Sequence, residues 1–154
     1  MLDPIVKTIE VPCSQETAFN VFIKEMDSWW PFESFSQSVM RGQKVNSLRV
    51  DARQGGQIVE VSSDDIEVLW GTITTFDPHD FLGMDFHIPH PSEEKRSDSQ
   101  VEVRFTVLAD DRTRVKLTQS NWEAFGDMAE MVHGGYGTAW GIIFDQAFRK
   151  ACGG

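Results

Sequence analysis

The chain has 154 residues, of which 40% are hydrophobic and 25% charged, and its formal net charge is −10. This length suits a single domain over residues 1–154, and a chain of this size buries about 68 to 70% of its extended-state surface without a stabilising metal or disulfide. The acidic charge and the scattered basic residues argue against a nucleic acid or an anionic membrane as partner. No apolar run approaches the roughly 20 residues of a membrane span, so we expect no membrane insertion.

The ends of the sequence indicate a cytoplasmic protein. Residues Met1 to Pro4 lack the basic region and the apolar core of a signal peptide. Cys13 and Cys152 lie at opposite ends of the sequence, and their spacing is not that of a metal site. We therefore expect two reduced thiols.

The first predicted elements are a strand and a helix. Residues Ile5 to Val11 alternate as a strand does, and Pro12 ends the strand. Ser14 is a suitable N-cap for a helix whose apolar stripe continues to about Glu25. The strand is expected to lead directly into the helix.

A second, short helix is predicted within residues 26–35. It contains Trp29 and Trp30, and Pro31 stops it. Adjacent residues on a helix point about 100° apart, so one tryptophan can enter a core while the other faces a cavity or the surface. The alternative is that both anchor the short helix to the body. Residues 36–46 show no clear period and are expected to form a loop.

Residues 47–120 follow the pattern of an antiparallel meander, with about six strands joined by turns. The expected strands are residues 47–53, 57–62, 66–76, 81–88, 101–107 and 113–120. Turn residues separate most of them, including Gly55-Gly56 and Asp110-Asp111. Residues 89–99 contain two prolines and a polar run, so they are expected to form an exposed loop.

The stretch Gly126 to Ala151 predicts a helix of about seven turns with an unusually aromatic face. Its apolar arc contains Met128, Val132, Tyr136, Ala139, Trp140, Ile143, Phe144, Ala147 and Ala151. Four glycines lie inside this helix, and each costs about 1 kcal/mol relative to alanine. That loss predicts either a close backbone approach or a kink at Gly134-Gly135. The aromatic face either lines an incompletely filled cavity or seals a sheet as ordinary core.

The histidines are the main candidates for chemistry. His87 and His90 lack the further ligands of a zinc site, so no metal is expected. His133 falls beside Trp140 and Tyr136 on the helical wheel, where it could face a cavity and act with the phenol as an acid or base. The alternative is a hydrogen-bonded structural histidine. No nucleophile triad, phosphate-binding loop or paired-carboxylate motif is visible, so we assign no catalytic residue, expect no cofactor and leave catalysis open.

Several short stretches, in this order and spacing, carry a resemblance to a known family. They are Val11 to Ser14, Ala18-Phe19, Trp29-Trp30, Gly55-Gly56, Trp70 to Ile73, Asp77-Pro78, Phe105 to Val107, Thr113 to Val115, Asn121 to Glu123, and Tyr136 to Gly141. The chain resembles the START/Bet v 1-like (SRPBCC) superfamily of small lipid and metabolite binders and polyketide cyclases. Within it, the chain is most similar to bacterial single-domain proteins named for the C-terminal domain of the Hsp90 ATPase activator. The resemblance implies an α+β helix-grip fold, in which a curved antiparallel sheet wraps around the long C-terminal helix.

The resemblance also implies a cavity between the sheet and the C-terminal helix. By match of position, its lining would be Trp29 or Trp30, Trp70, Met84, Phe86, Trp122, Tyr136, Trp140 and Phe144, and the helical wheel adds His133. Which parity of the central strands faces the cavity is left open.

We therefore expect a binder of a small apolar or amphipathic metabolite. One alternative is a protein-interaction role in stress or chaperone function. Another is a cyclase, dehydratase or hydrolase that uses His133 or His87 with Tyr136. A homodimer is left open, since homodimers are common among soluble proteins.

Overall fold

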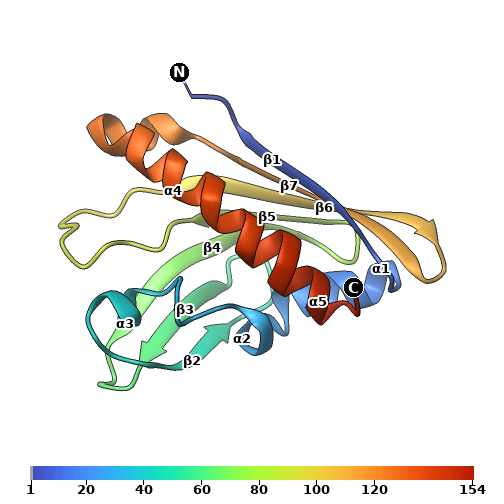
Figure 1. The fold of residues 1–154 in the computed structure, drawn as a ribbon, viewed down its shortest axis with the longest axis horizontal. Helices are drawn as coiled ribbons and strands as arrows, with labels where there is room; N and C mark the ends of the chain where they lie inside the picture. The colour runs from blue at the N-terminus through green and yellow to red at the C-terminus, as the bar shows by residue number, and fades with distance from the viewer. Residues whose placement is uncertain (1) are drawn as a thin grey trace.

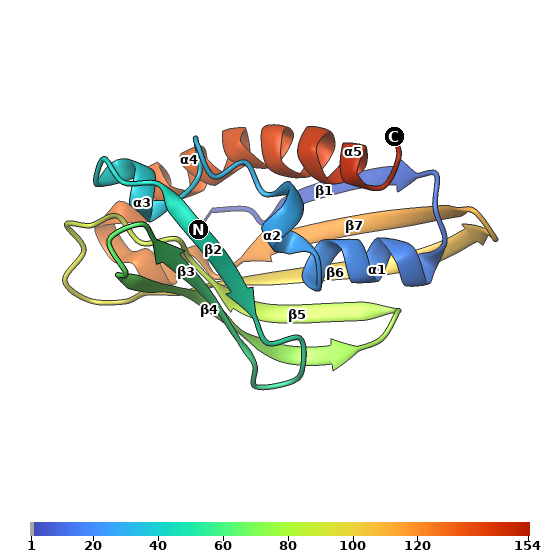
Figure 2. The ribbon, with the colours of Figure 1, turned by 90° about the horizontal axis from the view of Figure 1, so that it is seen from below.

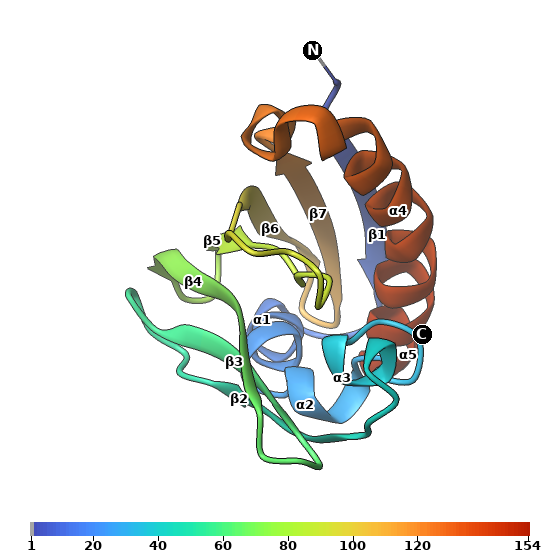
Figure 3. The same ribbon diagram turned by 90° about the vertical axis from the view of Figure 1, so that its left-hand side faces the viewer.

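The computed structural model describes residues 2–154 as one curved antiparallel sheet with helices on its concave face (Figure 1). The elements in chain order are β1 (Ile5–Val11), α1 (Gln15–Ile23), α2 (Met26–Trp29), α3 (Gln37–Met40), β2 (Val45–Val50), β3 (Gln57–Ser62), β4 (Glu67–Asp77), β5 (Phe81–Phe86), β6 (Ser99–Ala109), β7 (Arg112–Ser120), η1 (Trp122–Met128), α4 (Ala129–Ile142), η2 (Ile143–Phe148) and α5 (Arg149–Ala151). Figure 2 shows the helices over one face of the sheet, and Figure 3 shows the sheet bending around them. The predicted helix-grip fold is confirmed.

The seven strands have the order β1-β7-β6-β5-β4-β3-β2, and every neighbouring pair is antiparallel. Strands β2 to β7 form the predicted meander, and β1 closes the far side by pairing with β7. The alternation in β6 and β7 is the clearest case, because Val103 faces Leu117 across the pair and both are fully buried. Among residues 2–154, no helix has the length and apolar character needed to cross a membrane.

The first two helices form where they are predicted. The hydroxyl of Ser14 accepts the N–H of Thr17 and so caps α1. Trp29 and Trp30 at the end of α2 are both buried, and their indole groups donate to the backbone carbonyls of Val21 and Phe35 at 2.7 and 2.8 Å. Both tryptophans therefore anchor the short helix to the body.

Residues 36–46, expected as a loop, contain α3 and the start of β2. The hydroxyl of Ser36 caps α3 by accepting the N–H of Val39. The carboxylate of Glu60, on β3, accepts the N–H groups of Gln37 and Ser38. Glu60, a residue far along the chain, thus satisfies terminal N–H groups of this single turn of helix. No local period in the sequence could therefore have predicted the turn.

The C-terminal helix begins later than predicted, because Gly126 has φ 55° and ψ −125° and interrupts the helical course inside η1, so that α4 starts only at Ala129. The helical course then continues from Ala129 through a π-helical stretch, η2, to α5. Because η2 adds a residue per turn, it changes the phase of the apolar arc. Phe148 is consequently buried and Ala151 of the predicted arc is exposed, while Met128, which belongs to η1 rather than to α4, is also exposed.

Both explanations predicted for the glycines are wrong. Helix α4 runs unbroken through Gly134 and Gly135. Within the described chain, a Cβ added at either of them or at Gly141 would meet no atom within 4 Å, and one at Gly137 would make an ordinary contact with Ile5. The helix therefore tolerates these glycines without any close approach by its own chain.

Candidate functional site

A layer of aromatic rings lies between the concave face of the sheet and α4. Trp30 is at its centre, with ring centroids 4.9 Å from Trp70 and 6.2 Å from both Phe86 and Trp140. Tyr136 lies 6.1 Å from Phe86 and stacks on Trp140 at 6.2 Å. The sequence analysis predicted all five residues as lining, and the fold brings them into mutual contact.

The other predicted residues lie around this layer. Trp29 contacts Trp30 at 5.8 Å, and Phe144 is buried behind it against Phe148. Met84 is buried on β5, two residues before Phe86 and on the same side of the strand. The parity left open for β5 is therefore the one that points Met84 and Phe86 inward.

Trp122 and His133 lie at the outer end, beyond Tyr136. Trp122 is buried 6.2 Å from Tyr136, and the ring of His133 lies 4.9 Å from that of Trp122. The Nε2 of His133 is 3.0 Å from the carbonyl oxygen of Asp3, so the imidazole binds the N-terminal segment. The structure thus pairs a different histidine with the phenol of Tyr136.

Trp70 enters the layer because β4 bulges at that position. Ile58 pairs with Gly71 and the next residue, Val59, pairs with Leu69, which leaves Trp70 as the extra residue. Such a bulge redirects a side chain and frees local backbone groups. The indole Nε1 of Trp70 then donates to Glu60 at 2.8 Å.

Two buried polar residues that the sequence analysis missed hold the indole rings in place. Glu60 is fully buried and joins Trp70 to the start of α3. Gln119, on β7, is also fully buried and accepts the indole N–H of Trp140 at 2.7 Å. Because the indole N–H groups of Trp30, Trp70 and Trp140 all have partners, these rings have fixed orientations rather than the freedom of a fluid core.

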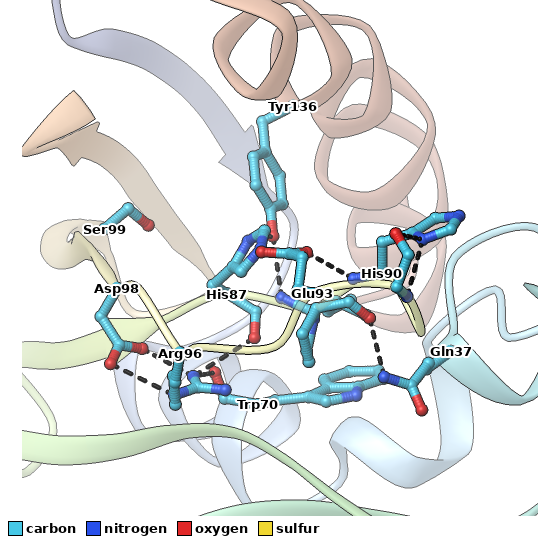
Figure 4. Close-up of polar contacts among 12 residues, drawn as sticks. Gln37, Trp70, His87, His90, Glu93, Arg96, Asp98, Ser99 and Tyr136 are labelled. Atoms are coloured by element: carbon cyan, nitrogen blue, oxygen red, sulfur yellow. Dashed lines mark hydrogen bonds and ion pairs between the residues drawn. The ribbon is translucent and has the colours of Figure 1, made fainter. Parts of the chain in front are cut away.

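At the edge of the aromatic layer, Tyr136 of α4 binds the loop that follows β5 (Figure 4). The hydroxyl of Tyr136 accepts the N–H of Ile88 at 2.9 Å and lies 2.9 Å from Nδ1 of His87. The Nε2 of His87 lies 3.1 Å from both carboxylate oxygens of Glu93. We call Tyr136, His87 and Glu93 the latch.

One arrangement of protons satisfies the whole latch. Since the oxygen of Tyr136 already accepts the N–H of Ile88, its proton is donated to Nδ1 of His87, and the proton of His87 on Nε2 is donated to Glu93. Burial lowers the pKa of His87 and so favours the neutral ring. The carboxylate of Glu93 acts in the opposite direction, but its effect on the pKa is smaller. Burial also raises the pKa of Tyr136, so the phenol keeps its proton.

Other polar contacts hold the loop, residues 87–98, against the sheet and α3. The guanidinium of Arg96 donates to the carbonyls of Leu69 and Trp70 at 2.5 and 2.6 Å, and its ion pair with Asp98 holds it there. Gln37, on α3, donates to the carbonyl of Pro89 at 2.9 Å. Residues 90–95 are exposed, so the loop is a cover attached mainly by hydrogen bonds.

Comparisons with known proteins identify the family and support the fold. The family model described as "Activator of Hsp90 ATPase homolog 1-like protein" matches residues 12–147. The anthrahydroquino-Gama-pyrone synthase Txn09, solved in complex with SUM, is 28% identical, with 86% of this chain and 85% of that chain covered and a TM-score of 0.59. A search of curated proteins found no match.

Two more distant structures support the fold alone. The self-sacrificing resistance protein CalC from Micromonospora echinospora is 18% identical, with 97% of this chain and 90% of that chain covered and a TM-score of 0.65. The Aha1 dimer from Colwellia psychrerythraea is 15% identical, with coverages of 92% and 90% and a TM-score of 0.61.

Proposed function

Because the chain belongs to the family of Activator of Hsp90 ATPase homolog 1-like proteins, we propose that it binds a small apolar or amphipathic metabolite in the aromatic layer beneath loop 87–98. The observation that carries the proposal is the latch, which places the hydroxyl of Tyr136 and the ring of His87 at the edge of this layer. A core that only sealed the sheet would not need these groups, since burying polar groups is unfavourable unless each finds a partner.

Ligand entry requires the loop to open. Movement of residues 88–98 breaks the contact of Glu93 with His87 and that of Ile88 with Tyr136, which leaves the phenol of Tyr136 and Nε2 of His87 free to bind an oxygen of the ligand. Trp140 and Phe86 then offer flat apolar faces to the rest of the molecule. A planar ring system with a hydroxyl or carbonyl group at one end suits this combination.

The similarity to Txn09 supports the same class of ligand. The name of that protein denotes the synthesis of an anthrahydroquino-pyrone, a fused-ring aromatic compound with oxygen substituents. Loop 87–98 and most of the aromatic layer lie within residues 12–147, the part of this chain that the family model matches.

The binding test uses 1,8-dihydroxyanthraquinone as a planar probe and the fluorescence of the buried tryptophans as the signal. We expect the probe to quench the tryptophan fluorescence of the wild type. The affinity of Tyr136→Phe for the probe should be about tenfold lower, which corresponds to one lost hydrogen bond of about 1.4 kcal/mol. Trp140→Phe should reduce the fluorescence change while the far-UV circular dichroism stays intact. Thr138→Val, an exposed change on the same helix, is the matched control. Equal binding by all three variants would place the ligand elsewhere.

Native mass spectrometry of protein purified from its own host provides a test that needs no chosen probe. An added mass of a few hundred daltons that leaves on unfolding would support the carrier function and identify the ligand. Retained protein partners with no added small mass would instead favour the interaction role that the family name suggests.

The latch also favours a second candidate, acid–base catalysis by His87 and Tyr136. Glu93 orients the imidazole and the imidazole contacts the phenol, which is the order of groups that proton transfer to a bound ligand requires. This candidate predicts turnover that falls when His87 takes up a proton below its usual pKa range, and that is lost in His87→Gln. Turnover that survives this substitution would remove it.

A further inference from the structure

The two cysteines, 139 positions apart in the sequence, lie together where the C-terminal end of the chain meets the junction of β1 and α1. Figures 1 and 2 place the C terminus beside this junction. The thiols of Cys13 and Cys152 lie close enough for each to affect the pKa of the other. Their neighbours also meet, because a Cβ at Gly153 would lie 3.9 Å from Cγ of Pro12. Residues 12 and 13 near the N-terminal end of the chain therefore lie beside residues 152 and 153 at its C-terminal end.

The backbone on each side is held by its own hydrogen bonds. The N–H of Cys152 donates to the carbonyls of Phe148 and Arg149 at 3.1 Å each, which ends the helix. The carbonyl of Cys13 accepts the hydroxyl of Thr113 at 2.9 Å. Cys152 is buried in the core, whereas Cys13 is partly exposed. Each cysteine thus belongs to a segment that hydrogen bonds hold in place, and the thiol of Cys13 can be reached from solvent.

We propose that Cys13 and Cys152 form a reversible disulfide that ties the end of the C-terminal helical segment to the β1–α1 junction. The proposal is independent of the ligand-binding function. It requires an oxidant, for which a low-molecular-weight disulfide such as oxidised glutathione is suitable.

The reaction proceeds by two exchange steps. Cys13 loses its proton and attacks one sulfur of oxidised glutathione, forming a mixed disulfide and releasing one glutathione thiolate. Cys152 then loses its proton and attacks the sulfur of Cys13, which releases the second glutathione thiolate. The two thiolates take up the two protons, so the protein is oxidised by two electrons and one glutathione disulfide is reduced to two thiols.

The surroundings of the pair predict a slow reaction. Burial raises the pKa of both thiols, and the carboxylate of Glu25 raises that of Cys152 further. The thiolate is the attacking species, so the rate should increase as the pH rises above neutrality.

The bond would constrain nearly the whole chain and fix one end of the aromatic layer. Cross-linking residues this far apart in sequence restricts the unfolded chain strongly. One turn before Cys152, Phe148 contacts Trp29 at 5.3 Å and Phe22 at 5.2 Å. Oxidation should therefore raise the melting temperature by several degrees and reduce motion at this end of the layer.

The test equilibrates the native full-length protein with oxidised and reduced glutathione, blocks free thiols with an alkylating agent, and measures the intact mass and a non-reducing peptide map. We expect a monomer lighter by two hydrogens, a linked peptide pair containing Cys13 and Cys152, and a melting temperature that falls again on adding dithiothreitol.

The single variants Cys13→Ala and Cys152→Ala serve as controls, with circular dichroism to check that they fold. Neither should show the oxidised rise in melting temperature. Two thiols that stay fully alkylatable under oxidising conditions would overturn the proposal. So would disulfides that link only separate chains, or a bond that forms only in urea.

Discussion

Replacing Tyr136 with phenylalanine removes one oxygen atom and tests the latch directly. The change leaves the N–H of Ile88 and Nδ1 of His87 without their partner, and both residues are buried. A buried polar group without a partner costs about 1–3 kcal/mol. Two such groups lose their partner, so we expect the free energy of unfolding to fall by about 3 kcal/mol.

The assay is urea unfolding, followed by tryptophan fluorescence and by circular dichroism, together with hydrogen exchange at the amide of Ile88. Thr138→Val removes a hydroxyl from the exposed side of the same helix, and it should change the free energy of unfolding by no more than about 0.5 kcal/mol. A loss below about 1 kcal/mol in Tyr136→Phe, with unchanged protection of the Ile88 amide, would refute the latch as described.

Three further substitutions test the buried network, the glycines and the titration of the latch. Glu60→Gln places an amide donor among the N–H groups of α3 and the indole of β4, so the free energy of unfolding in urea should fall by about 2–4 kcal/mol. The control Glu67→Gln, on the exposed side of the sheet, should leave the unfolding midpoint unchanged. Gly134→Ala should stabilise the fold by about 0.5–1 kcal/mol in thermal melts, because the added Cβ meets open space. Gly71→Ala should destabilise it severely, because the added Cβ would collide with the backbone of β5. A destabilised Gly134→Ala would show that the helix needs this glycine. Burial lowers the pKa of His87, so the unfolded chain takes up this proton first, and stability should fall as the pH drops below about 6.5. His87→Gln should make the urea midpoint less dependent on pH in this acidic range, and equal slopes in the two proteins would contradict the assignment.

Most of the secondary structure could be predicted from the sequence, because it depends on neighbouring residues. The alternation in Val101 to Val107 and the turn at Asp110-Asp111 specify a hairpin through side-chain period and turn chemistry alone. Ser14 caps a helix through a contact three residues away. The aromatic stripe around Tyr136 and Trp140 likewise indicated which face of the last helix is buried.

The details of the candidate site depended on tertiary structure. The bulge that turns Trp70 inward arises from its pairing with β3, and Glu60 acquires its role only when β3 lies beneath α3. His87 and Tyr136 are 49 positions apart, and no local pattern distinguishes His87 from His133 as the partner of the phenol. Periodicity reports which side of an element is apolar, whereas hydrogen bonds between distant elements, and the pKa shifts that follow from burial, exist only once the chain has folded.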